Sequence, residues 1–109
     1  MLILSTKLKN AINKHSNGMD LTFTFKNISI NGQKRGCSGF IRNNTNGSVM
    51  YVTTEEPCLS TLHYMYRYAD HERDWTGYRN RWANTLDELA SAICTCLHKT
   101  PQEANERRI

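Results

Sequence analysis

The chain has 109 residues, which is enough for one domain with a single hydrophobic core. Its formal net charge is +4 and is unevenly spread: residues 1–42 hold seven Lys/Arg against one acid, whereas residues 43–109 hold seven against nine. The apolar start MLIL is too short for a secretory signal, and no segment approaches the ~20 apolar residues of a transmembrane helix. We therefore expect no membrane insertion and a cytoplasmic protein, whose four cysteines are thiols or metal ligands rather than disulfides.

An amphipathic helix is expected at the start of the chain. Its apolar stripe recurs at helical spacing and comprises Leu4, Leu8, Ala11, Ile12 and His15. Ser5 or Thr6 is placed to cap the N-terminus of this helix. Gly18 can end the helix because glycine adopts the left-handed conformation without strain.

Residues 21–54 predict a three-stranded β-meander, around which the rest of the chain is organised. Apolar and polar residues alternate over residues 21–25, the period of a half-buried strand. Ile28 and Ile30 continue the apolar set but are shifted by one position. We expect a β-bulge near residues 26–27 to return both sets to one face of the sheet.

Turn signals separate the strands of this meander. Asn31-Gly32 is typical of a two-residue hairpin turn. The five residues 43–47 contain three Asn and end in Gly, so they predict a loop. The second strand is then expected at about residues 36–42 and the third at residues 49–52.

The segment after the meander is harder to assign. Residues 63–69 (HYMYRYA) fit a strand by alternation and a helix by apolar spacing, and we favour the strand because aromatic residues prefer strands. Residues 58–62 could form a short helical turn. Residues 70–81 are charged and have no regular period, which indicates a long surface loop with aromatic anchors.

The last helix has the clearest signals. Thr85 and Glu88 form a capping box directly before an apolar run. The core stripe of this helix is Leu86, Leu89, Ala90, Ile93 and Leu97. Pro101 ends the helix, and we expect residues 100–109 to be a flexible tail. The order of elements indicates one α+β domain over residues 1–99, an antiparallel sheet of three to four strands with an N-terminal and a C-terminal helix packed on one face.

Cysteine and histidine residues offer a candidate zinc site. Cys94 and His98 are four residues apart on the expected last helix, so their side chains lie on one face and can share a tetrahedral zinc ion. The candidates for the remaining ligands are Cys58, His63 and Cys37. A weaker surface cluster comprises Asp70, His71 and Asp74. Because the chain has no Cys-x-x-Cys pair, we favour buried thiols and ordinary surface histidines over structural zinc, which stays as the alternative.

Catalytic motifs do not stand out in the sequence. A Cys–His pair would lack a marked oxyanion hole and an orienting third residue. Gly36-x-x-Gly39 lies inside a hairpin, not at the strand-to-helix turn of a phosphate-binding loop. We therefore expect that the protein is not an enzyme, and a zinc-dependent or thiol enzyme is the last alternative.

Binding is the function that the composition favours. The segment 64–82 is rich in Tyr, Trp and Arg, which are enriched in interface hot spots, and its acidic residues suit a basic partner protein. The candidate partner-binding residues are Tyr64, Tyr66, Arg67, Tyr68, Asp70, Glu72, Asp74, Trp75 and Tyr78. Nucleic-acid binding is the alternative, because basic residues of the meander could follow a phosphate backbone. Those residues are Lys26, Lys34, Arg35 and Arg42.

The chain also resembles a known family. Five short segments together are similar to the large polyvalent protein-associated domains of mobile genetic elements: GCSGFI (36–41), YVTTE (51–55), YRYA (66–69), NRWA (80–83) and LDELA (86–90). The similarity spans about residues 28–97 and carries no activity to particular residues. Some small proteins of such elements are anti-CRISPRs. The resemblance therefore implies a phage or mobile-element inhibitor that binds and blocks a type II RNA-guided nuclease of the bacterial host.

Overall fold

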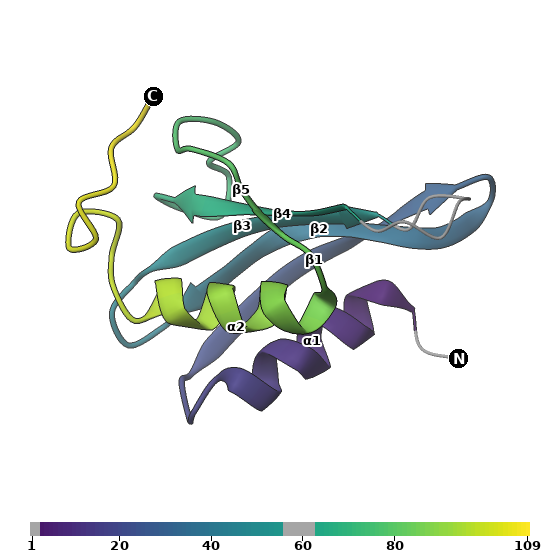
Figure 1. Ribbon diagram of the computed structural model, residues 1–109, viewed down its shortest axis with the longest axis horizontal. Coiled ribbons are helices and arrows are strands. Elements are labelled where there is room, and N and C mark those ends of the chain that lie inside the picture. Colours follow the sequence, from purple (N-terminus) through teal and green to yellow (C-terminus); the bar gives the residue numbers. More distant parts are fainter. Residues whose placement is uncertain (1–2, 56–62) are drawn as a thin grey trace.

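A five-stranded antiparallel sheet with two helices on one face makes up the protein (Figure 1). The computed structural model describes residues 3–55 and 63–109. Its elements are α1 (Leu4–His15), β1 (Leu21–Ile30), β2 (Gln33–Asn43), β3 (Val49–Glu55), β4 (His63–Ala69), β5 (Arg81–Ala83) and α2 (Leu86–Leu97). The strands are ordered β1-β2-β3-β4-β5 across the sheet. The α+β class and the two packed helices confirm the sequence prediction, whereas the sheet has one strand more than the largest number expected.

The two helices begin in different ways. The Oγ1 atom of Thr85 accepts a hydrogen bond from the backbone N–H of Glu88 at 3.1 Å, as the capping box of α2 predicts. The N-cap of α1 is Ile3, and no side chain caps this helix. The predicted cap at Ser5 or Thr6 is therefore wrong, because α1 begins at Leu4, two residues earlier than a cap at Ser5 requires and three earlier than a cap at Thr6 requires. Ser5 instead donates to the side chain of Asn27 on β1.

A register shift in the first hairpin differs from the expected bulge. Ile28 pairs with Gly36, but Ser29 pairs with Lys34, so Arg35 is the extra residue and lies on β2. The bulge predicted at residues 26–27 is absent from the described strand. As a consequence Ile28 lies on the opposite face of the sheet from Phe25, and the two apolar sets of β1 do not share one face.

The assignments around β4 are resolved by strand pairing. Residues 63–69 form β4, which confirms the favoured strand, and Tyr64 to Tyr66 pair with the short strand β5. β5 begins at the last residue of the expected loop 70–81 and was not predicted, because a three-residue strand shows no periodic pattern in the sequence. The helical turn expected at residues 58–62 lies outside the described residues.

The hydrophobic core lies between the helices and the sheet. Leu8 and Ile12 of α1 and Leu89 and Ile93 of α2 are fully buried there. The strands contribute alternate residues, including Ile41, Met50 and Val52, which the antiparallel register places side by side. Each helix has 12 residues, and neither of these described helices has the length and apolar character needed to cross a lipid bilayer.

Candidate protein-binding surface

The face of the sheet that the helices do not cover is called the open face here. The register of the four strand pairs aligns one row of side chains across all five strands of this face. The row runs through Trp82, Met65, Thr53, Ser38 and Lys26, from β5 to β1. It therefore joins a tryptophan at one edge of the sheet to a lysine at the other, with Met65 and the two small polar side chains of Thr53 and Ser38 between them.

The next row on the open face is covered by the loop of residues 70–80, which connects β4 to β5. Trp75 of this loop packs edge-on against Phe40 and Tyr51, with ring centroids 5.1 and 5.9 Å apart. The guanidinium of Arg67 lies over the Tyr51 ring at 4.5 Å and donates to the backbone oxygen of Asp74 at 2.7 Å. The loop thus closes one end of the open face with an aromatic cluster.

Ion pairs from the end of the chain hold this loop in place. The buried carboxylate of Asp74 accepts hydrogen bonds from Arg108 at 2.7 and 3.0 Å and from the backbone N–H of Asp70 at 2.8 Å. Mainly because of the Arg108 guanidinium, the pKa of Asp74 falls to about 2. Tyr78 donates to Asp70 at 2.7 Å, and its ring lies under Arg108 at 5.1 Å. Arg108, which belongs to the segment 100–109 expected as a flexible tail, therefore packs on the loop.

Two further ion pairs fasten neighbouring parts of the same region. Arg42 of β2 donates to the carboxylate of Glu72 in the loop, through Nε at 2.9 Å and through Nη2. Arg81 of β5 donates to both carboxylate oxygens of Glu106 at 2.9 and 3.0 Å. The loop and the last residues of the chain are thus tied to the sheet at separate points.

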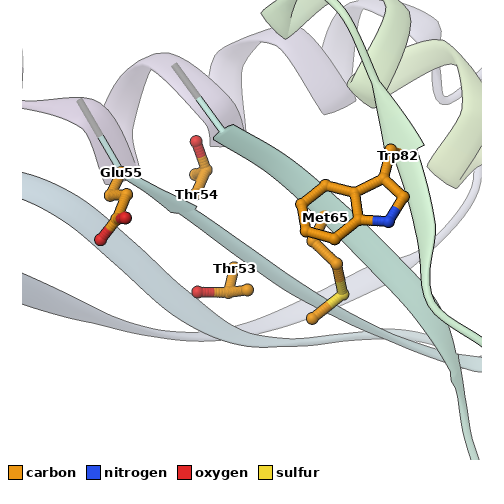
Figure 2. Close-up of a pocket in the computed structure, with 5 residues that line it drawn as sticks. All are labelled: Thr53, Thr54, Glu55, Met65 and Trp82. Atoms are coloured by element: carbon orange, nitrogen blue, oxygen red, sulfur yellow. The ribbon is translucent and has the colours of Figure 1, made fainter. Parts of the chain in front are cut away.

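The rest of the open face is uncovered by the described residues and is hollowed. A depression of about 290 Å³ lies beside Trp82 and Met65, as Figure 2 shows, and it is lined by Thr53, Thr54, Glu55, Met65 and Trp82. A second depression of about 270 Å³ is lined by Thr24, Lys26, Ser38, Gly39, Phe40, Glu72, Arg73 and Trp75. The two depressions adjoin, because Ser38 and Thr53 are cross-strand partners.

One exposed tryptophan lines each of the two depressions. Trp75 is 59% exposed and Trp82 is 65% exposed, although both are large apolar side chains. Where the depressions adjoin, the cross-strand partners Ser38 and Thr53 have short side chains. We define the tryptophan groove as the two adjoining depressions together with Trp75 and Trp82.

The predicted partner-binding residues divide into two groups. Tyr64, Arg67, Tyr68, Asp74 and Tyr78 are buried, with at most 4% of the surface of each residue exposed. The tyrosines of β4 face the helices, where Tyr68 donates to the backbone oxygen of Cys96 at 3.3 Å. A partner on the surface of this structure cannot reach them without a rearrangement.

The other predicted residues lie closer to solvent. Tyr66 is half-buried on the helix face, and Glu72 is half-buried in its ion pair with Arg42. Asp70 and Trp75 are exposed. The sequence interpretation left out Trp82 and Met65. The alternation of β4 already placed Met65 opposite the tyrosines, but the pairing of Met65 with Trp82 depends on β5.

The candidate zinc ligands are not brought together among the described residues. Cys37 and Cys94 are buried, and desolvation raises the pKa of Cys37 to about 12 and that of Cys94 to about 11. The thiol of Cys94 donates to the backbone oxygen of Ile12, whereas His98 is exposed at the end of α2. No group of three His, Cys, Asp or Glu suited to a metal occurs within residues 3–55 and 63–109.

Two zinc candidates fall outside this description, and the surface cluster has another role. Cys58 and the side chain of His63 lie outside the described residues, so structural zinc stays a prediction that elemental analysis of the purified protein tests. In the weaker cluster, both Asp70 and Asp74 bind Arg108, whose guanidinium occupies the place that a cation would take. His71 accepts a hydrogen bond from the backbone N–H of Arg73.

The basic residues proposed for nucleic-acid binding are dispersed. Lys26 is exposed at the end of the open-face row, whereas Arg42 is neutralised by Glu72. Arg35 donates to Gln33 at 2.6 Å, and the side chain of Lys34 is outside the described part of the chain. No continuous track of unpaired basic side chains joins the three described members of this set.

Comparison with known proteins identifies no relative, so the function is inferred from the fold and the tryptophan groove. No family model matches the chain, and searches of curated proteins and of solved structures find no match. The resemblance to the large polyvalent protein-associated domains therefore stays a prediction based on short segments.

Proposed function

We propose that the protein is a non-catalytic binding module that contacts another protein through the tryptophan groove. The observation that supports this proposal most directly is the exposure of Trp75 and Trp82, each of which lines one of two adjoining depressions on a sheet face that the other described residues leave uncovered. Tryptophan is enriched in interface hot spots because one ring buries a large area at a small cost in conformational entropy.

The dimensions of the surface are consistent with such a role. A standard interface buries about 800 Å² on each partner, roughly an eighth of the 6446 Å² accessible surface of this chain. Polar groups at the rim of the groove, including Glu55, Lys26 and Arg73, can form the hydrogen-bonded margin that surrounds the apolar contacts of an interface.

The fixed position of Trp75 and its loop on the open face also supports binding by a preformed surface. Trp75 is fixed by Phe40 and Tyr51 beneath it, and its loop is fastened through Asp74 and Arg108. A side chain that is already ordered loses little conformational freedom when a partner packs on it, so more of the contact energy appears as affinity.

The more specific part of the proposal is that the partner is a type II RNA-guided nuclease and that binding inhibits it. This part is supported by the family resemblance alone. A protein without catalytic groups can inhibit a nuclease by covering a surface that the nuclease needs, so the groove and the inhibition would be one function. Inhibition of a host nuclease also agrees with the expected cytoplasmic location and the expected mobile-element origin.

A reconstituted cleavage assay tests both parts. The wild-type chain, Trp82→Ala, Trp75→Ala and the control Asn10→Ala, which changes an exposed residue of α1, are titrated into purified type II effector, guide RNA and target DNA. We expect stoichiometric inhibition by the wild type and the control, and at least about tenfold weaker inhibition by each tryptophan variant. Equal inhibition by all four chains would refute the groove, and absence of inhibition and complex formation with type II effectors would refute the nuclease partner.

A further inference from the structure

A second surface lies at the edge of the sheet formed by β1 (Figure 1). β1 has ten residues, contains no proline, and has a strand neighbour on one side only among the described residues. The opposite edge is different, because β5 has three residues and Arg81 is held there by Glu106 from the end of the chain. A long open edge presents unpaired backbone groups that can accept another strand.

The register identifies which backbone groups of β1 point outward. The N–H of Asn44 donates to the oxygen of Asp20 at 2.9 Å, and in an antiparallel ladder such bonded positions recur at every second residue. Even-numbered residues from 20 to 28 therefore bond to β2. The backbone N–H and C=O groups of Leu21, Phe23, Phe25 and Asn27 point away from the sheet, toward the open edge.

Side chains beside this edge form a short rim. Phe23 and Phe25 are half-buried on the helix face, with ring centroids 5.4 Å apart, and they line a depression of about 200 Å³ with Ser5, Thr6 and Lys9 of α1. The ammonium of Lys9 lies 5.4 Å from the centre of the Phe23 ring. An added strand would find apolar contact with the two rings at alternate positions.

The charge of the edge is positive on both faces of the sheet. Lys9 lies beside it on the helix face, and Lys26 of β1 projects from the open face. The same basic part of the sequence, residues 1–42, holds Asp20 as its one acid and five more basic residues: Lys7, Lys14, Lys34, Arg35 and Arg42. A second copy of this edge would bring like charges together, whereas an acidic strand would be attracted.

We propose that β1 accepts an extended acidic segment of another protein as a sixth strand, with apolar residues packed on Phe23 and Phe25 on the helix face and acidic residues near Lys26 on the open face. Outward backbone groups at every second residue match a peptide backbone and not a phosphate backbone. Lys9 and Lys26 lie on opposite faces of the sheet, so they do not form a track for nucleic acid. This edge is distinct from the tryptophan groove, and its use does not depend on the function proposed for the groove.

A matched pair of variants isolates the strand pairing. Asn27→Pro removes an outward N–H that bonds to nothing in the sheet, and proline is tolerated at such edge positions. Asn27→Ala removes the same side chain and its bond to Ser5 but keeps the N–H. Circular dichroism and a thermal melt confirm that both variants fold.

The probe is a synthetic peptide of about eight residues in which Val and Glu alternate, the length of an ordinary strand, and binding is measured by calorimetry. We expect the wild type and Asn27→Ala to bind it, and Asn27→Pro to bind about tenfold more weakly. Lys26→Glu should also weaken binding, because Lys26 lies on the face that the Glu side chains occupy, whereas Lys14→Glu, with the same change in net charge on the side of α1 facing Asp87, should not. Hydrogen exchange at Phe23 and Phe25 should slow when the peptide binds.

Four outcomes of the peptide experiments would overturn the proposal. They are no binding of the Val-Glu peptide, equal affinity for a Val-Lys peptide, equal affinity of Asn27→Pro and Asn27→Ala, and displacement of the peptide by a single-stranded oligonucleotide that binds Asn27→Pro as well as the wild type. A wild-type dimer that Asn27→Pro disrupts would assign the edge to a second copy and would also overturn it. Trp82→Ala should leave peptide binding unchanged, which separates this surface from the groove.

Discussion

The two faces of the sheet are covered by different means. On the helix face, Ile41, Met50 and Val52 are fully buried against apolar stripes of α1 and α2. On the open face, Phe40 and Val49 reach similar burial because a loop folds over one end of the sheet. The middle of the open face has no such cover among the described residues, and there the depressions occur.

A strand residue that another part of the chain covers and a strand residue that stays exposed can therefore have the same local sequence pattern. A helix covers a face continuously, because its apolar residues recur every three to four positions over its whole length. A loop covers only the part of the sheet against which its anchor residue packs. Here the anchor is Trp75, which packs on Phe40 and Tyr51. The boundary of the loop therefore defines the groove.

The largest expected effect is on the free energy of unfolding, which should fall for a substitution under the helices and hardly change for one on the open face. Ile93→Ala removes a fully buried side chain of α2 and should lower the free energy of unfolding by about 2–5 kcal/mol, through lost burial and the cavity left behind. Trp82→Ala, on the open face, should change it by less than about 0.5 kcal/mol. Urea denaturation followed by circular dichroism measures both. Similar losses for the two variants would mean that the open face is part of the core.

A second variant tests how closely β1 and β2 approach. Gly39 has φ +155°, and a Cβ atom there would lie 2.0 Å from the backbone oxygen of Thr24. Gly39→Ala should therefore lower the free energy of unfolding by about 1–3 kcal/mol. Gly18→Ala is the matched control, because Gly18 has φ +82° but open space around its Cβ position. Denaturant midpoints compare the two, and an equal cost would show that the clash at Gly39 relaxes freely.

A smaller effect is expected at the loop that covers the open face. Because the pKa of Asp74 is lowered to about 2 from its ordinary value of 3.8, its ion pair with Arg108 stabilises the loop fully above pH 3.8. That stabilisation is lost as the pH falls through about 2. In a Trp82→Phe background, the fluorescence of Trp75 should report the release of the loop over this interval.

The control for this acid transition is Asp74→Asn in the same background. This variant has no carboxylate to titrate at that position, so its Trp75 fluorescence should already report a loosened loop at neutral pH and should show no further step in acid. Far-UV circular dichroism at each pH separates loop release from unfolding of the whole domain. An identical acid step in both chains would assign the transition to another group.

The smallest expected effect concerns thiol reactivity and leaves stability unchanged at neutral pH. Burial raises the pKa of Cys37 to about 12, so its thiol stays protonated at pH 8 and should react slowly with iodoacetamide, which requires the thiolate. Cys94 should behave alike, since its pKa is raised to about 11. Peptide mapping by mass spectrometry measures the labelling of each cysteine. Labelling of Cys37 as fast in native protein as in denaturant would contradict its burial in the core.

Part of the fold could be predicted because its signals are local. The stripe of α2 and the capping pair Thr85 and Glu88 are complete within one segment, and the hairpin at Asn31-Gly32 needs only positive φ at both turn residues. Such features are set by nearest neighbours along the chain. They correctly placed both helices and the strands of the meander.

The tryptophan groove could be predicted only in part. Trp75 was selected from composition, but the exposure of Trp82 depends on β5, whose three residues have no detectable period. The tyrosines of β4 have the composition of an interface, yet most of them lie under α2, because alternation shows which residues share a face and not which face the helices cover. The register shift at Arg35 likewise appears only when β1 and β2 are paired.

The sequence by itself determined the class of the domain, the two helices and the main hairpin, since these follow from periodicity and from the conformational preferences of single residues. The tertiary structure alone decided which face stays open, where Trp82 stands and how Arg108 reaches Asp74. Those features join residues far apart in the chain, such as the pair between Arg108 and Asp74, and no local pattern records such contacts. The groove and the basic edge are therefore properties of the assembled sheet.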